Sequence, residues 1–269
     1  GVSDLTATVP AHVDYSPDAA MVSYLDFFGG CGEPQVVWTA QMKNGDVIRV
    51  RQTIHVTPVY TYVYDYHDYP MDTLEELQAL LQRLETETNR VHDVILYLPP
   101  VTYEGRLELT GRSFEFHGCT DGEQRTTFAG TVQVTAENAY WITYFYDIDF
   151  IGNPDEIGIS SSAKSWMVGC SFTGYKTGVL AYGTAWVNLT ECRFTDNQVG
   201  FHFNSTGQSA SSDYFGENQF TGNGTAVLLE NVPTDMTLYF DGSSFSGNDT
   251  DIDNRCNHSI DLSIVTFDK

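Results

Sequence analysis

Two glutamates and an arginine, Glu191, Arg193 and Glu217, have the types and spacing expected of a carbohydrate-cleaving site. If Cys192 and Phe194 point into a core, strand alternation turns Glu191 and Arg193 outward. Glu217 takes the position of Glu191 one repeat later, which predicts two stacked carboxylates near the roughly 5 Å spacing of retaining glycosidases. Arg193 beside them can hold a carboxylate or stabilise an anion. The alternative, and the commoner arrangement, is a solvated Glu–Arg pair on a charged surface.

Three further residues, Asp149, His202 and Trp186, are candidates for binding a sugar ligand. The same register places Asp149 outside on an earlier coil. Alternation also turns His202 outward, but the sequence offers it no evident acid–base partner, so an ordinary surface histidine is the alternative. Trp186 qualifies because exposed aromatic rings can stack on sugars, and we expect Tyr175 and Tyr182 to be exposed as well. The positions equivalent to His202 in other repeats are Gln133, Gly158, Leu180, Leu228 and Asp253.

Metal and disulfide chemistry have weaker signals. Asp147, Asp149 and Glu191 could share a calcium ion, although the chain has no Asp-x-Asp-x-Asp-Gly loop and solvated acids are the commoner arrangement. We therefore predict no cofactor, with calcium as the one candidate. Cys170 and Cys192 occupy the same position in neighbouring repeats, within disulfide range, and the alternative is a pair of buried thiols. No Cys-x-x-Cys zinc signature occurs among Cys31, Cys119, Cys170, Cys192 and Cys256.

Composition limits the partners. The chain has 269 residues, of which 41% are hydrophobic and 18% charged, and its net charge of 13 − 36 = −23 makes nucleic acid and anionic membranes poor partners. The same charge disfavours an anionic polysaccharide unless a metal or a basic groove intervenes. No stretch approaches the roughly 20 apolar residues of a membrane span, so we expect no membrane insertion. The first residues do not read as a signal peptide, but a chain whose export segment has been removed would look the same.

The elements that must position these residues come from a repeat. Each repeat contains a phenylalanine whose two neighbours in the strand are expected to point the opposite way. These phenylalanines are spaced 22, 22, 26 and 25 residues apart, at Phe150, Phe172, Phe194, Phe220 and Phe245. Five positions before each of them lies an apolar residue: Phe145, Met167, Leu189, Phe215 and Phe240. A second alternating strand follows each Gly-Asn-like turn. The period is too short for propeller blades and leaves no room for a helix in each unit.

This pattern predicts a parallel β-solenoid in which each coil stacks about 4.8 Å above the last. The phenylalanines then form an internal aromatic stack. At the turn we expect an asparagine ladder of Asn153, Asn197, Asn223 and Asn248, interrupted by Tyr175. Asn and Gly tolerate tight-turn geometry, and the side-chain amides of stacked asparagines can hydrogen-bond to one another and to the backbone.

From about Asp72 onward the chain resembles the right-handed parallel β-helix proteins of the pectin-lyase-like superfamily. Besides the coils, Asp72-Thr73-Leu74-Glu75 is typical of a helix start, with Asp72 as the N-cap, and leucines at helical spacing follow it. Val94 to Leu98 and the Pro-Pro-x-x-Tyr turn after it are similar to the family's first strand. The resemblance implies a helix over about 73–86 that covers the end of the solenoid.

The marked enzymes of that family are not matched. The Asn-Thr-Asp, Gly-His-Gly and Arg-x-Lys segments of polygalacturonases are missing, Trp141-Ile142 matches only half of a pectate-lyase segment, and Asp149-Phe150-Ile151-Gly152 is a partial match to pectin methylesterases. The family also contains non-catalytic surface proteins, so fold does not give function.

Residues 1–71 lie outside the repeat and are predicted to form a small β segment packed on the solenoid. Val36 to Val56 is typical of a hairpin with a type I′ turn at Asn44-Gly45, and Val59 to Tyr66 is another strand signal. The sequence as a whole predicts an all-β fold: a single-stranded right-handed parallel β-helix of about seven coils over 72–269, with one capping helix.

The function expected from these observations is an exported or cell-surface domain that recognises or acts on carbohydrate. A glycan or a surface protein is the expected partner. Two alternatives remain, a structural or adhesive module without catalysis and a lyase or hydrolase that uses Glu191, Arg193 and Glu217.

Overall fold

The computed structural model describes residues 2–8, 11–16, 21–27, 32–55, 58–135, 141–207 and 215–268, so Cys31 lies outside the described residues. The chain divides into two compact units, Gly1–Val59 and Tyr60–Lys269. No helix of the described chain combines the length and the apolar character needed to cross a membrane.

The first unit is a small antiparallel β structure. Its sheet has the order β1 (Val2–Thr8), β4 (Gln35–Met42), β5 (Val47–Thr53), and β2 (Ala11–Ser16) pairs with β3 (Met21–Phe27). The predicted hairpin joins β4 to β5, but its turn is not type I′ because Gly45, at φ 91°, is the one residue of Asn44-Gly45 with positive φ. The amide of Met42 donates to the carbonyl of Asp46, and this hydrogen bond closes a three-residue loop with a glycine bulge.

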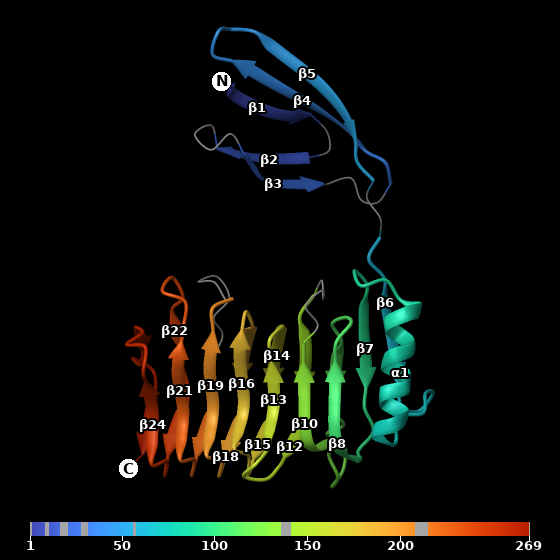
Figure 1. Cartoon of the computed structure of the whole chain (residues 1–269). Coiled ribbons are helices and arrows are strands. Elements are labelled where there is room, and N and C mark those ends of the chain that lie inside the picture. Colours follow the sequence, from blue (N-terminus) through green and yellow to red (C-terminus); the bar gives the residue numbers. More distant parts are fainter. Residues whose placement is uncertain are drawn as a thin grey trace. The chain divides into compact units, whose positions relative to one another are not determined.

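The second unit is a parallel β-solenoid of about seven turns, as the repeat predicted. Figure 1 shows its strands following one another in sequence order, with α1 beside β6 and β7 at the N-terminal end. The central turns each supply a strand to three faces. Face A is formed by β6 (Thr61–Asp65), β7 (Asp93–Tyr97), β9 (Glu115–His117), β11 (Thr143–Tyr146), β14 (Lys164–Val168) and β17 (Trp186–Thr190).

Faces B and C follow in each turn and belong to one continuous hydrogen-bonded path. Face B consists of β12 (Asp149–Ile151), β15 (Ser171–Thr173), β18 (Arg193–Thr195), β20 (Gln219–Thr221), β23 (Ser244–Ser246) and β26 (Thr266–Asp268). Face C consists of β13 (Ile157–Ser161), β16 (Thr177–Gly183), β19 (Val199–Ser205), β21 (Thr225–Asn231) and β24 (Thr250–Asn254). In the early turns β8 (Thr102–Leu109) and β10 (Thr127–Val134) run through both faces, and late in the chain β22 (Leu238–Tyr239) pairs with β25 (Ile260–Asp261).

The strand signal before residue 71 belongs to this solenoid. Strand β6 pairs in parallel with β7, and the compact unit begins at Tyr60, earlier than the expected start at Asp72. The reason is that a lone alternating strand looks the same whether its neighbour is parallel or antiparallel. The packing of the first unit on the solenoid stays a prediction.

The predicted phenylalanine stack forms, and it is longer than the repeat indicated. Ring centroids of successive turns lie 4.7 to 5.6 Å apart over the whole series. The five apolar residues that the repeat places five positions before its phenylalanines are all fully buried, as predicted: Phe145, Met167, Leu189, Phe215 and Phe240. Such spacing is the strand separation of a sheet, so the aromatic stack fixes the register of every turn. Its members are Tyr103, Phe128, Phe150, Phe172, Phe194, Phe220, Phe245 and Phe267.

The asparagine ladder forms at three of its four predicted positions. The Oδ1 atom of Asn223 accepts hydrogen bonds from the backbone and side-chain amides of Asn197, both at 3.0 Å, and Asn248 does the same for Asn223 at 2.9 Å. Asn153 is exposed and lies outside the ladder. The expectation that Tyr175 is exposed is also wrong: it is fully buried, and its hydroxyl donates to the carbonyl of Gly130 at 2.9 Å.

The predicted helix is α1 (Leu74–Glu87), and it buries Leu77, Leu80, Leu81 and Leu84. Its N-cap is Thr73 and not Asp72: the Thr73 hydroxyl accepts from the amide of Glu76, whose carboxylate accepts from the amide of Thr73. This reciprocal capping box is one residue later than the sequence indicated.

Two further expectations on the repeat have a clear outcome. The position equivalent to His202 in β13 is Ser160 and not Gly158, because Ser160 pairs with Leu180, which pairs with His202. Cys170 and Cys192 are free, buried thiols, and each donates to a backbone carbonyl of the preceding turn, at 3.3 and 3.4 Å. Burial, together with the neighbouring thiol of Cys192, raises the pKa of Cys170.

Candidate functional site

The predicted catalytic glutamates lie at the corner between faces A and B. Glu191 and Glu217 are exposed and have positive φ, 57° and 61°. Asp147, with φ 57°, occupies the corner two turns before Glu191, and Gly169 and Gly242 occupy it in other turns at φ 65° and 73°. Because glycine recurs here, the fold itself requires a left-handed residue at this corner. The turn therefore accounts for the backbone of both glutamates, and their catalytic role stays a prediction.

Arg193 and Asp149 lie on face B. Arg193 is exposed, whereas Asp149 accepts hydrogen bonds from Nε of Arg125 at 3.0 Å and from the hydroxyl of Ser171 at 2.6 Å. Arg125 also donates to the carbonyl of Asp147 at 3.0 Å. The Asp149 carboxylate is thus engaged in an ion pair within the protein. No group of three or more His, Cys, Asp or Glu side chains among the described residues is arranged to hold a metal ion.

His202 lies on face C, and the expectation that it lacks a partner is wrong. Its Nε2 atom lies 2.9 Å from Oε2 of Glu230, which also accepts from the side-chain amide of Asn204 at 3.0 Å. A β-bulge in β21 pairs Asn204 with Asn231 and leaves Glu230 as the extra residue. Strict alternation cannot show this contact because the bulge shifts the register.

Trp186 lies on face A, in β17, where its ring meets that of Trp166 edge to face at 6.3 Å. The sequence-predicted residues are therefore distributed over three faces and one corner. The structure does not bring Trp186 together with Arg193 or with His202, because each belongs to a different sheet face.

Face A carries a strip of outward aromatic rings that the sequence analysis did not identify as a unit. Three of the four tryptophans of the chain, Trp141, Trp166 and Trp186, lie in or directly before its strands. Successive ring centroids are 4.9, 4.6, 5.6, 5.8 and 6.3 Å apart across five neighbouring strands. This aromatic strip consists, in order, of Tyr97, His117, Tyr146, Tyr144, Trp166 and Trp186.

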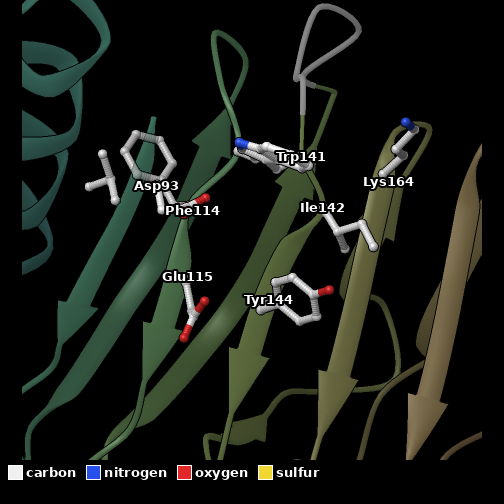
Figure 2. A pocket seen from close by; sticks show the side chains of 9 residues that line it. Asp93, Phe114, Glu115, Trp141, Ile142, Tyr144 and Lys164 are labelled. Atoms are coloured by element: carbon white, nitrogen blue, oxygen red, sulfur yellow. The ribbon is translucent and has the colours of Figure 1, made fainter. Parts of the chain in front are cut away.

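A hollow of about 410 Å³ opens next to the aromatic strip, a size that suits small ligands. In Figure 2, Glu115 and Tyr144 come from adjacent strands, Trp141 lies above them in the view, and Lys164 lies to their right. The Trp141 side chain is 40% exposed, and its indole N–H donates to the carbonyl of Val91 at 2.8 Å. This first hollow is lined by Asp93, Val94, Ser113, Phe114, Glu115, Trp141, Ile142, Tyr144 and Lys164.

Glu115, which lines the first hollow, is paired with His117 on the same strand. Oε1 of Glu115 lies 2.6 Å from Nε2 of His117, and both side chains are about 30% exposed, at 31% and 27%. His117 is stacked between Tyr97 and Tyr146, so its faces are covered and its polar edge is directed to Glu115. Burial, followed by the negative charge of Glu115, raises the pKa of Tyr146 to about 12 and also raises that of Tyr144. Both tyrosines therefore keep their hydroxyl protons at neutral pH.

The candidate site residues of face A were not predicted, for two reasons. Alternation around the inward Phe145 and Met167 already places Tyr144, Tyr146 and Trp166 outward, so that signal was present in the sequence. For Glu115 and His117 it was not, because 29 positions separate Phe116 from its stacking partner Phe145, more than in any aligned repeat.

Comparison of the chain with protein-family models, with curated proteins and with solved structures found no match.

Proposed function

We propose that this protein is an exported or cell-surface β-helix domain that binds carbohydrate on face A. The observation that carries the proposal is the first hollow, whose lining combines an accessible tryptophan, Trp141, with Tyr144 and Glu115. A pectin-lyase-like relationship is part of the proposal, since the solenoid and its capping helix agree with it.

A sugar presents apolar C–H faces and hydroxyl groups, and the site offers a complement to both. Trp141 supplies apolar ring surface, while the Tyr144 hydroxyl and the Glu115 carboxylate supply a hydrogen-bond donor and acceptors. The charges of the lining are mixed: Asp93 lies near the buried guanidinium of Arg112, and the lining also holds both Glu115 and Lys164. This balance favours a neutral sugar over a uronate in the first hollow.

The test is a panel of neutral and acidic polysaccharides, each with and without calcium. Affinity electrophoresis reports retention, and mass spectrometry reports any product. We expect retention by at least one neutral polysaccharide, weakened at least tenfold by Trp141→Ala and unchanged by Tyr239→Ala, a similarly exposed aromatic side chain in β22. The absence of both retention and products across the panel would contradict the proposal.

The same panel separates binding from catalysis. Products that disappear with Glu191→Gln and Glu217→Gln would support the corner glutamates as catalytic, with Arg193 as their anion-stabilising neighbour. Products that disappear with Glu115→Gln would assign the reaction to face A. Retention without products would leave a binding domain.

A further inference from the structure

We propose that the carbohydrate site continues along β9 into a second hollow, so that the ligand is an extended, uncharged or amine-bearing oligosaccharide and not a single terminal sugar. This inference rests on the proposed function and specifies its ligand. The second hollow has a volume of about 230 Å³ and is lined by Asp65, Tyr66, His67, Tyr97, Leu98, His117, Gly118, Cys119, Thr120 and Asp121.

Strand β9 runs from the first hollow to the second and forms the floor between them. Glu115 lines the first hollow and His117 lines the second, and the 2.6 Å contact between their side chains joins the two along β9. On the adjacent strand β11, Tyr144 and Tyr146 run beside them with ring centroids 5.6 Å apart. A ligand that leaves the first hollow along this strand therefore stays above hydrogen-bonding side-chain edges.

The length of the floor sets the length of the ligand. From Ser113 in the first hollow to Gly118 in the second there are five residue steps, or about 17 Å of extended chain. A pyranose unit, built from bonds of about 1.5 Å, adds roughly 5 Å to a linear chain, so the floor accommodates about three units. A monosaccharide would occupy the first hollow alone.

Charge defines the chemistry at the second end. Asp65 and Asp121 line the second hollow, and no lysine or arginine is among the described residues that line it. The backbone and side chain of His67 donate to Asp65, and these hydrogen bonds lower the pKa of that carboxyl, so it is ionised at neutral pH. A uronate is repelled there, whereas a neutral sugar or an ammonium group is not.

The experiment measures affinity against ligand length for the full chain. The probes are cello-, manno- and xylo-oligosaccharides of one to five units, with galacturonate oligomers as the charged comparison, and tryptophan fluorescence and calorimetry are the readouts. In the series that binds, we expect the dissociation constant to fall at least tenfold from two units to three or four and then to level off. Galacturonate oligomers should bind at least tenfold more weakly at equal length.

A pair of variants locates the gain. Tyr97→Ala in the second hollow is expected to abolish the gain with length, and Trp141→Ala is expected to weaken all lengths; Tyr239→Ala is the control outside both hollows. Affinity that does not change with length, a length gain that survives Tyr97→Ala, or tighter binding of galacturonates would each overturn this inference while leaving carbohydrate binding in place. Failure of every oligosaccharide to bind would instead overturn the proposed function.

Discussion

Replacement of Asn223 by alanine is the sharpest test of how the solenoid is held at its turns. The Asn223 side chain is buried and sits in the middle of the ladder. Its Oδ1 accepts two bonds from Asn197, and its Nδ2 donates to Oδ1 of Asn248 and to the carbonyl of Phe194, both at 2.9 Å. Nδ2 also donates to the carbonyl of Thr221 at 3.3 Å, and alanine removes all five bonds.

The magnitude follows from the groups left without partners. The backbone amide of Asn197 loses its acceptor inside the protein, which costs about 1–3 kcal/mol, and each of the other lost bonds adds about 0.5–1.5 kcal/mol at most. We therefore expect Asn223→Ala to lower the free energy of unfolding by about 3 kcal/mol. In a domain of this size that corresponds to a fall in melting temperature of about 6–12 °C.

The matched control is Asn153→Ala. Asn153 occupies the same position of the repeat, but it is exposed and its Oδ1 accepts one bond, from the amide of Asp155 at 3.0 Å. Its loss should cost less than about 1 kcal/mol. Thermal melts followed by tryptophan fluorescence suit the comparison, because three of the four tryptophans belong to the solenoid. Equal melting temperatures for the two variants would refute the ladder as the stabilising element.

Three further predictions follow from the geometry. Gly152→Ala should destabilise the solenoid by about 1–3 kcal/mol, because the added Cβ would lie 1.9 Å from the Tyr175 ring; an unchanged chemical-denaturation midpoint would argue against that packing. Glu191→Gly should leave the melting temperature unchanged or raise it, since glycine takes the left-handed corner freely; a fall of several degrees would show that the glutamate side chain itself stabilises the fold. Burial raises the pKa of Tyr146 in the folded state above that of the unfolded chain, so its contribution to stability is fully present below about pH 10 and is lost as the pH rises toward 12. Ultraviolet titration of wild type against Tyr146→Phe should lose one tyrosine that ionises near pH 12, and loss of one that ionises near pH 10 would contradict this assignment.

The solenoid could be predicted from the sequence because a stacked repeat states its own register. Each inward phenylalanine must meet the one above it, and Phe172, Phe194 and Phe220 do so at centroid distances of 5.0 and 4.8 Å. The errors arose where a turn changes length. Phe150 is nine positions before the paired residue Ile159, whereas Phe172 is seven before Val179, so two extra residues shift the following strand.

The same two residues explain the break in the ladder. The longer turn carries Asn153 to the surface, and the next turn fills the space with Tyr175, whose ring lies directly over Gly152. A single local insertion thus accounts for the wrong register at Gly158, the exposed asparagine and the buried tyrosine. An alignment without gaps cannot predict this insertion, because the residue types still match the repeat while the directions of their side chains have changed.

The candidate site was harder to predict than the fold for a related reason. Inward positions are constrained by their neighbours above and below, so their chemistry repeats; outward positions are free to differ from turn to turn, and nothing in the pattern marks Glu115 or His117 as partners. The corner glutamates were predicted as catalytic because they repeat, yet glycine recurs at the same corner, which shows that the fold requires a positive φ there. In a solenoid, residues that do not repeat are therefore the better guide to function, and on face A Glu115 and His117, each of which lines one of the two hollows, are residues of this kind.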